Sequence, residues 1–343
     1  MKRQLAALLL TIFALSLTAC GETAAESETR TVYAMDTVMN LTVYGENAAA
    51  ALESAEKELH TLDEAVLSRT AEGSELYALN ASNGETVECG ADDILPALIE
   101  TALTISDATE GAFDPTLAPV LDAWGFTKDE RRVPSADELK ELLSHTGCGK
   151  VALEKTADGW TVTLLDGAQL DLGGIAKGYA AGRVRTILRE AGVTSAIISL
   201  GGNVAAVGKK PDGSAWTVGL QDPDRPEAYF GTVSIEDACV VTSGAYQRYF
   251  EENGVCYHHI LDPHTGCPAE SGVKSVSVVA QDDTLADALS TALFVMGLDA
   301  GAEFQKSSGL AFEAVFVTDD NTVWITPGLA GRYRSDRPYQ ILE

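Results

Sequence analysis

The sequence predicts an α+β fold in which mixed sheets pack against helices. Its 343 residues and 45% hydrophobic content are enough to build a sizeable core. Segments with the two-residue period of strands and segments with helical spacing follow one another without the strict βαβ alternation of a parallel-sheet protein. No repeat or low-complexity run interrupts the chain after residue 31. We therefore expect residues 31–343 to form one folded unit.

The first thirty residues predict export and attachment to a membrane surface. Two basic residues precede an apolar run, Leu5–Leu17, which is too short to span a bilayer comfortably and ends in small residues. Cys20 directly follows Leu-Thr-Ala, a sequence that resembles the bacterial lipobox. We expect residues 1–19 to be a signal peptide, Cys20 to be lipidated and residues 20–30 to form a tether. An ordinary signal peptide with an incidental cysteine is the alternative.

Apolar spacing, capping residues and turn residues place the remaining elements. We predict helices over residues 47–67, 74–83, 92–109, 135–143 and 176–191, and two more over 284–296 and 298–306, separated by Gly297. We predict strands over residues 31–44 (interrupted at 35–37), 161–172 (with one more strand before it), 195–200, 203–207, 216–221, 232–235, 240–244, 256–261 and 274–280, and a closing hairpin over 312–318 and 322–325.

The charge of the chain restricts the partners that it can bind. The net charge is −27, and it becomes −29 once the signal peptide is removed with its two basic residues, Lys2 and Arg3. So acidic a protein is unsuited to nucleic acid or anionic lipid as its main partner. An anionic substrate would need a divalent cation as a bridge.

Cysteine usage indicates neither a disulfide framework nor a zinc site. Five cysteines remain after Cys20, and none forms a C-x-x-C pair. We expect most of them to be small buried residues. A Cys256–Cys267 bridge stays open as an alternative.

The stretch from Gln169 to Arg189 predicts a site for an anion. A strand ending near Asp171 leads through Gly173 and Gly174 into a helix over Ala176–Ala191, with Gly192 as its C-cap. Free N–H groups and the positive end of the helix dipole then lie together, which suits a phosphate. The stretch matches neither a P-loop nor a G-x-G-x-x-G fingerprint. A strand-to-helix connection without a ligand is the alternative.

Asp287 and Thr291 predict a cation site. Four residues apart on a predicted helix, they lie on one face about one turn from each other. A carboxylate and a hydroxyl are hard oxygen ligands that suit Mg²⁺, which keeps water and phosphate oxygens in its other positions. The alternative is a surface acid beside a packed threonine.

Seven motifs in one order resemble the ApbE family, the FAD:protein FMN transferases. They are Met35-Asp36-Thr37, Ala112-Phe113-Asp114-Pro115-Thr116, Asp171-Leu172-Gly173-Gly174-Ile175-Ala176-Lys177-Gly178, Gly201-Gly202-Asn203, Thr242-Ser243-Gly244, His258-His259-Ile260-Leu261-Asp262-Pro263-His264-Thr265-Gly266 and Ala286-Asp287-Ala288-Leu289-Ser290-Thr291-Ala292. The resemblance covers roughly residues 31 to 330 and implies an ApbE-like fold with an FAD site in a central cleft.

The resemblance implies an enzyme that splits FAD and places the FMN half on a Ser or Thr of an exported acceptor protein through a phosphoester bond, releasing AMP. It implies Mg²⁺ held by Asp287, Thr291 and the carbonyl of Gly174. It also implies a set of FAD contacts, of which Thr70 is a loose match: Met35, Thr70, Ala112, Phe113, Asp114, Asp171, Lys177 and Leu261. Capping of the turn before Pro115 is a rival role for Asp114.

The transfer needs a base near the FMN phosphorus, and His259 is the candidate, since a histidine near its ordinary pKa of about 6.5 can take the acceptor proton. His258 and His259 would point to opposite faces of a strand, so that only one faces the cleft. The resemblance favours His259. Its alternative role is structural, as a hydrogen-bond partner of the Asp262 turn.

Two other functions remain as alternatives. Water in place of the acceptor hydroxyl would make the protein a Mg²⁺-dependent FAD pyrophosphatase that yields FMN and AMP. A lipoprotein that only binds flavin would not need a pair of oxygen ligands for a metal beside a phosphate-binding turn. We expect the protein to act at the extracytoplasmic face of the bacterial cell membrane.

Overall fold

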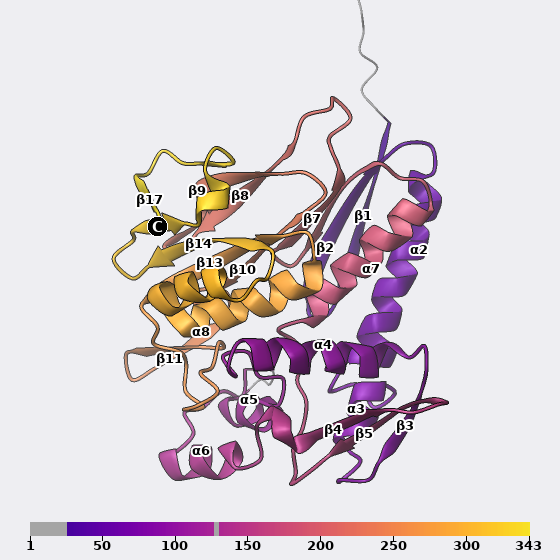
Figure 1. The fold of residues 1–343 in the computed structure, drawn as a ribbon, viewed down its shortest axis with the longest axis vertical. Coiled ribbons are helices and arrows are strands. Elements are labelled where there is room, and N and C mark those ends of the chain that lie inside the picture. Colours follow the sequence, from indigo (N-terminus) through magenta and orange to yellow (C-terminus); the bar gives the residue numbers. More distant parts are fainter. Residues whose placement is uncertain (1–25, 127–129) are drawn as a thin grey trace, which may run out of the picture.

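The computed structural model describes residues 26–126 and 130–343, and it confirms a mixed fold of sheets and packed helices (Figure 1). Its main element is a nine-stranded sheet in which only the last pair is parallel. In spatial order its strands are β1 (Ser27–Ala34), β2 (Thr37–Tyr44), β6 (Ser195–Leu200), β7 (Asn203–Gly208), β10 (Cys239–Gly244), β13 (Val273–Ala280), β14 (Phe312–Thr318), β15 (Val323–Ile325) and β17 (Tyr339–Ile341).

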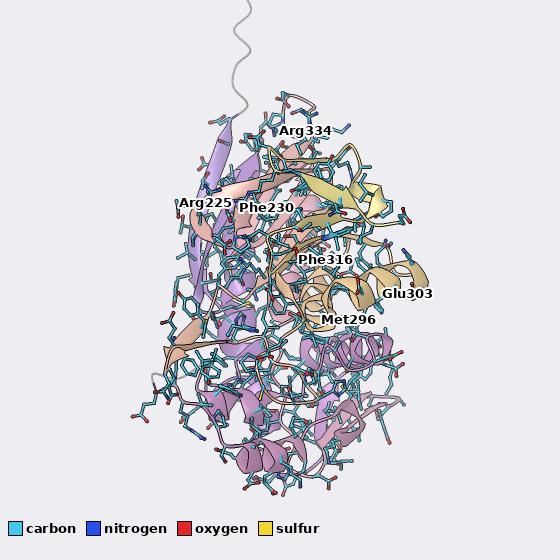
Figure 2. All side chains as sticks on the ribbon, turned by 90° about the vertical axis from the view of Figure 1, so that its left-hand side faces the viewer. Arg225, Phe230, Met296, Glu303, Phe316 and Arg334 are labelled. Carbon is cyan, nitrogen blue, oxygen red and sulfur yellow. The ribbon has the colours of Figure 1, made fainter. Side chains whose placement is uncertain are left out.

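Helices cover one face of this sheet: α2 (Ala48–His60), α7 (Ala176–Glu190) and α8 (Asp283–Ser307). A three-stranded sheet made of β16 (Tyr333–Arg334), β9 (Arg225–Ile235) and β8 (Trp216–Asp222) covers the other. The central strands are therefore buried on both faces. Successive residues of β14 show this: Phe316 joins the core on the helix side and lies against α8 (Figure 2), whereas Val315 and Val317 join the core under β8 and β9.

A second layer lies below the nine-stranded sheet in Figure 1. It contains a three-stranded sheet and four helices, and α2 enters it through a π-helical segment, Thr61–Leu67. The helices are α3 (Glu75–Asn80), α4 (Ile94–Ala108), α5 (Ala118–Trp124) and α6 (Ala136–Leu143), and the strands are β3 (Val87–Gly90), β5 (Gly159–Leu164) and β4 (Val151–Lys155). A hairpin of β11 (Tyr249–Glu252) and β12 (Val255–His258) pairs separately. Three-residue 3₁₀ turns lie at Cys148–Lys150 and Pro327–Leu329.

The predicted break in the last long helix is confirmed. α8 is interrupted at Gly297, where φ is +76° and a Cβ would lie 2.5 Å from the carbonyl oxygen of Ser271. Only glycine fits this position. The helix is long and apolar enough to cross a membrane by composition, but it packs on β13 and β10 and more than half of its most apolar window is buried inside the protein. We therefore assign α8 to the core.

Several predicted boundaries are wrong. The tether was expected to reach residue 30, but β1 begins at Ser27 because each residue from Ser27 onward pairs with β2. The strand predicted over 161–172 ends at Leu164, since a turn follows and residue 169 pairs with Leu117 instead. The strand predicted over 256–261 is Val255–His258, so His259 lies just beyond it.

Candidate functional site

A cavity of about 920 Å³ lies where the nine-stranded sheet and the second layer meet. Every predicted site residue within the described part of the chain lines it: Met35, Thr70, Ala112, Phe113, Asp114, Asp171, Gly174, Lys177, His259, Leu261, Asp287 and Thr291. The predicted lipidation site, Cys20, lies outside the described residues. Residues more than 250 positions apart in sequence thus line one cavity, which is large enough for a dinucleotide.

The glycine turn, Gly173–Gly174, lines the cavity directly before α7. Its conformation is fixed by Asp171, whose Oδ1 accepts the N–H of Gly173 at 2.8 Å. Lys177 Nζ donates to the carbonyl oxygen of Gly173 at 3.2 Å. The ammonium group is thereby held beside the first turn of α7, where the helix dipole is positive.

Arg69 supports the turn from the second layer, and sequence analysis missed it. Its Nε contacts Asp171 Oδ2 at 2.7 Å, and its Nη2 contacts Asp122 Oδ1 at 2.6 Å. Burial alone would lower the pKa of Arg69, but the hydrogen bonds and charges of the two carboxylates raise it. The negative charges of the two aspartates compensate the positive charge of the guanidinium. Arg69 orients the turn through its contact with Asp171. No motif surrounds Arg69 in the sequence, and its partners lie 53 and about 100 residues away. Its role could therefore not be predicted from the residues next to it.

The first turns of α7 and α8 meet at the cation ligands proposed from sequence. The N–H of Gly178 donates to Asp287 Oδ2 at 2.7 Å. Thr291 Oγ1 lies 3.6 Å from the point where a Cβ of Gly174 would be. Ser243 of β10 lies behind it, 3.4 Å from Thr291 Oγ1 and 2.8 Å from Ser290 Oγ. Thr291 therefore lies beside Gly174, and both line the same cavity as Asp287, one helical turn before Thr291 on α8.

This donor set fits a hard cation that keeps much of its water. Asp287 Oδ1 makes no hydrogen bond with the residues that the structure describes, so it remains available to a cation. Over residues 26–126 and 130–343, no group of three or more His, Cys, Asp or Glu side chains gathers as a metal site. One carboxylate with hydroxyl and carbonyl oxygens suits Mg²⁺ rather than zinc or copper.

His259 is oriented by Arg248, the residue directly before β11 of the hairpin. Its backbone N–H and its ring Nδ1 both contact the carbonyl oxygen of Arg248, at 3.1 and 3.2 Å. Because a carbonyl can only accept, Nδ1 carries the proton and Nε2 keeps its lone pair. Burial lowers the pKa of His259 to about 4, and the charges of Arg248 and Lys177 add to the effect. The expectation that His259 has a pKa near the ordinary value of about 6.5 is therefore wrong, because the ring is buried beside two cations; the ring is neutral at neutral pH.

His258 belongs to the core side of the same segment. Its Nε2 contacts the carbonyl oxygen of Ala269 at 3.2 Å, and its ring meets Phe294 edge-on with centroids 5.5 Å apart. Burial lowers its pKa as well. His258 does not line the cavity and His259 does. The expectation that only one of the two faces the cleft is confirmed, although the strand ends before His259.

The segment around Asp114 joins the second layer to the glycine turn. Asp114 Oδ1 accepts the N–H and the hydroxyl of Thr116, at 2.8 and 2.6 Å, so its rival role of capping this turn is realised. The carbonyl oxygen of Pro115 accepts the N–H of Asp171 at 2.8 Å. The ring of Phe113 lies 3.1 Å from the Cβ position of Gly174. Asp114 thus shapes the cavity wall whether or not it also contacts a ligand.

The remaining predicted contacts lie around the rim and wall. Met35 is at the turn of the β1–β2 hairpin with φ of +50°, next to Asp36 with φ of +55°. Leu261 is buried and pairs with Pro268. Thr70 is exposed and its N–H donates to Ser68 Oγ at 3.3 Å. Arg248 also lines the cavity and was not proposed from sequence; no motif surrounds it.

No disulfide joins the two cysteines that sequence left open as a pair. Cys256 and Cys267 are both free thiols, and burial raises the pKa of each. The other cysteines of the described residues are free as well.

The fold matches that of solved flavin transferases, as comparison with known proteins shows. The chain belongs to the ApbE family, whose model matches residues 35–316. A FAD:protein FMN transferase of Treponema pallidum is 38% identical, over 92% of this chain and 91% of the relative.

Solved structures agree. The ApbE protein of Thermotoga maritima superposes with a TM-score of 0.82 at 33% identity, covering 90% of this chain and all of that one. The flavinyl transferase ApbE of Pseudomonas stutzeri superposes with a TM-score of 0.76 at 30% identity, covering 87% of this chain and 93% of that one. The predicted family and fold are confirmed.

Proposed function

We propose that the protein transfers the FMN moiety of FAD to a Ser or Thr hydroxyl of an exported acceptor protein, with release of AMP. The observation that carries this proposal is the convergence of the Gly173–Gly174 turn, Asp287 and His259 on one cavity. A diphosphate, a cation and a proton acceptor can meet there. Curated relatives from Treponema pallidum and Haemophilus influenzae are named FAD:protein FMN transferase, which supports transfer of FMN from FAD to a protein.

In this proposal Asp287, Thr291 and the carbonyl of Gly174 hold Mg²⁺. The bound ion would neutralise charge on the diphosphate, which an acidic protein cannot do with its side chains alone. Gly178 keeps Asp287 in place through its N–H, and Ser243 stands beside Thr291. Phosphoryl transfer needs mainly such positioning and charge neutralisation from a protein.

FAD would lie along the cavity with its diphosphate at the N-terminus of α7. Lys177 would contact the diphosphate, since Arg69 is already offset by two carboxylates. The other proposed FAD contacts are Met35, Thr70, Ala112, Phe113, Asp114, Asp171 and Leu261.

His259 would act as the general base. Nε2 takes the proton of the acceptor hydroxyl as its oxygen forms a bond to the phosphorus of the FMN half. The bond from that phosphorus to the bridging oxygen breaks, and AMP leaves with the bridging oxygen. The Nδ1–H bond to the carbonyl of Arg248 keeps the ring in the tautomer that this step requires.

We further propose that cleavage after residue 19 and lipidation of Cys20 hold the enzyme at the extracytoplasmic face of the bacterial cell membrane. The apolar run and the Leu-Thr-Ala-Cys sequence support this proposal. Mass spectrometry of the mature N-terminus tests it: a diacylglyceryl-modified Cys20 is expected, and an unmodified or uncleaved N-terminus would contradict it.

The activity is tested by incubating the protein with FAD, Mg²⁺ and an exported acceptor domain. Covalent flavin fluorescence at the acceptor's position in a denaturing gel is the expected result, lost with a chelator and with the acceptor Ser or Thr replaced by Ala. Release of FMN and AMP without a labelled acceptor would instead support the pyrophosphatase alternative. Bound FAD without any turnover would support a flavin-binding lipoprotein.

A further inference from the structure

A buried ion pair connects α7 and α8 behind the cation ligands. Arg185 of α7 and Asp283, the first residue of α8, are 2% and 4% exposed. Arg185 Nη1 donates to Asp283 Oδ2 at 2.6 Å. Neither residue faces the cavity. The pair therefore has no direct part in binding FAD.

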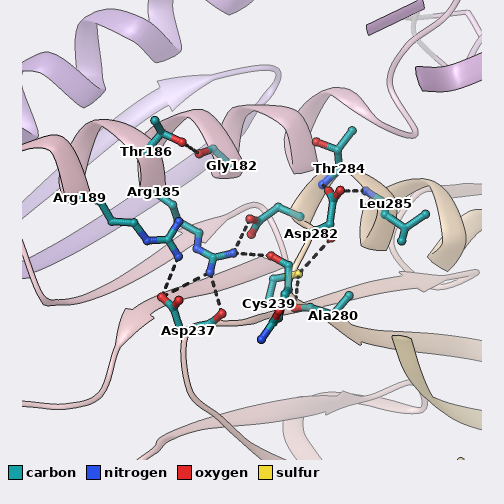
Figure 3. Close-up of polar contacts among 12 residues, drawn as sticks. Gly182, Arg185, Thr186, Arg189, Asp237, Cys239, Ala280, Asp282, Thr284 and Leu285 are labelled. Carbon is teal, nitrogen blue, oxygen red and sulfur yellow. Dashed lines mark hydrogen bonds and ion pairs between the residues drawn. The ribbon is translucent and has the colours of Figure 1, made fainter. Parts of the chain in front are cut away.

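The guanidinium of Arg185 also holds the backbone around the start of α8. Nη1 donates to the carbonyl oxygen of Gln281 at 2.9 Å, and Nη2 donates to the carbonyl oxygen of Asp237 at 2.8 Å. Figure 3 shows Arg185 reaching from α7 toward Asp237 and the α8 N-terminus at Asp282. The planar guanidinium directs its donors to these three partners from two separate nitrogens, a geometry that the compact ammonium of a lysine does not reproduce.

This pair is poorly suited to stabilising the fold by itself. Arg185 Nε and Asp283 Oδ1 are buried without hydrogen-bond partners among the residues that the structure describes. Burial raises the pKa of Asp283 in spite of the opposing charge of Arg185. Buried ion pairs of this kind are often no more stabilising than apolar side chains of the same size, and some of them serve to specify one arrangement.

The ion pair between Arg185 and Asp283 would specify the position of α8 relative to α7. Asp283 is one helical turn before Asp287, and Arg185 is about two turns after Gly178 on the same face of α7. Gly178 and Gly182 let the α8 N-terminus approach: a Cβ at Gly178 would lie 2.2 Å from the carbonyl oxygen of Asp283. The two helices thus meet at Gly178–Asp287 and at Arg185–Asp283.

We propose that Arg185 is a positioning residue for the cation site: its contacts with Asp283 and the backbone of Gln281 and Asp237 fix the place where α8 begins. The position at which α8 begins would then determine how Asp287 and Thr291 lie relative to Gly174. This inference rests on the proposed function, because it assigns Asp287 and Thr291 to a cation.

The test compares Mn²⁺ affinity with thermal stability in the folded mature protein without FAD. Arg185→Met combined with Asp283→Leu removes both charges and keeps apolar volume, so its melting temperature should stay near that of the wild type. Its Mn²⁺ dissociation constant, measured by electron paramagnetic resonance, should rise about 10–100-fold, as for other residues that orient metal ligands. Wild-type affinity in this double variant would overturn the inference.

Arg185→Lys serves where the double variant does not fold. It keeps the buried charge but replaces the planar fork with a single compact ammonium, so the contacts with Asp283, Gln281 and Asp237 cannot all keep their geometry and the Mn²⁺ affinity should also fall. Wild-type affinity would again overturn the inference. Arg189→Gln is the matched control, because Arg189 lies one turn further along α7 in an exposed pair with Asp237. Its affinity should not change, and a loss as large as that of Arg185→Lys would contradict a role specific to Arg185.

Asp287→Ala separates this inference from the proposed function. Mn²⁺ binding that is lost in Asp287→Ala but kept in the Arg185 variants rejects the positioning role alone. Mn²⁺ binding that survives Asp287→Ala rejects the cation site itself, and the positioning role with it.

Discussion

Gly178 and Asp287 join two helices whose first turns lie more than 100 residues apart in sequence. The N–H of Gly178 donates to Asp287 Oδ2 at 2.7 Å, and a Cβ on Gly178 would lie 2.6 Å from the Cβ of Asp287. Glycine is therefore required here for close approach. The carboxylate of Asp287 is oriented by the backbone of α7 and lines the same cavity as the glycine turn that precedes α7. Site geometry thus depends on how closely α7 and α8 pack.

Gly178→Ala should push the helices apart and abolish metal-dependent transfer. Overpacking of this kind lowers the free energy of unfolding by about 1–3 kcal/mol. Gly182→Ala is the matched control on the same helix, because its Cβ would meet Asp283 at 3.7 Å, an ordinary contact. Activity and chemical denaturation measure both effects. Equal loss of activity in the two variants would contradict the close-approach argument.

Asp287→Ala should abolish Mg²⁺-dependent turnover, since it removes the only carboxylate of the proposed ligand set. Steady-state transfer assays over a Mg²⁺ series measure this change. Asp299→Ala, an exposed acid later in α8, should leave the Mg²⁺ dependence unchanged. If Asp287→Ala retains wild-type turnover, the metal assignment is wrong.

His259→Ala should reduce the rate of FMN transfer by about 10²–10⁴-fold, which is typical for loss of a general base. FAD affinity, measured by quenching of flavin fluorescence, should change far less. His264→Ala, in the exposed turn that follows, should retain activity. A loss confined to FAD affinity would exclude the role of His259 as base.

The kcat/KM of transfer should be independent of His259 protonation across the physiological pH range, because the ring stays neutral there. Because burial lowers the pKa of His259 to about 4, Nε2 is free above that pH in the unliganded enzyme. The value of kcat/KM should therefore fall only in acid, as pH passes downward through about 4. An acidic limb near the ordinary histidine value of about 6.5 would contradict the observed environment.

The same two histidines should make stability fall in acid. In the unfolded chain a histidine takes up a proton near pH 6.5, whereas the folded protein resists protonation of His258 and His259. Protons therefore favour the unfolded state, and the free energy of unfolding should decrease as pH falls below about 6.5. Denaturation curves of the wild type and His259→Ala between pH 7 and pH 5 measure the difference; parallel curves would contradict it.

Arg69→Lys should raise the KM for FAD while the metal dependence stays normal. A lysine lacks the planar fork that contacts Asp171 through Nε and Asp122 through Nη2, so the support of the glycine turn from the second layer should weaken. Arg132→Lys, in an exposed pair with Glu138, is the control and should behave as the wild type. An unchanged KM in Arg69→Lys would show that Asp171 alone is enough to hold the turn.

Local signals in the sequence predicted most elements and the members of the site. Asp282 caps α8 by accepting the N–H groups of Thr284 and Leu285, and Gly192, which was predicted to end α7, follows that helix with φ of +81°. Such caps and turns depend on residues near in sequence. Each of the seven motifs is also a short local sequence, and their order along the chain predicted the family.

Short or isolated elements were missed because their stability comes from distant partners. α5 spans only seven residues, and its Trp124 Nε1 donates to the carbonyl oxygen of Gly266 at 2.7 Å. β3 and β17 have four and three residues and exist as strands only through pairing with β5 and β15. Too few residues are present in such elements for a period to show.

The sequence by itself determined which groups this protein has for its chemistry: one helical Asp–Thr pair, a glycine turn before a helix and two adjacent histidines. Only the tertiary structure decided how they are held. Arg69 and Arg185 lie in no motif, and their partners are set by packing between elements distant along the chain. Hydrogen bonds and ion pairs act over a few ångströms in space, a distance that sequence separation does not reveal.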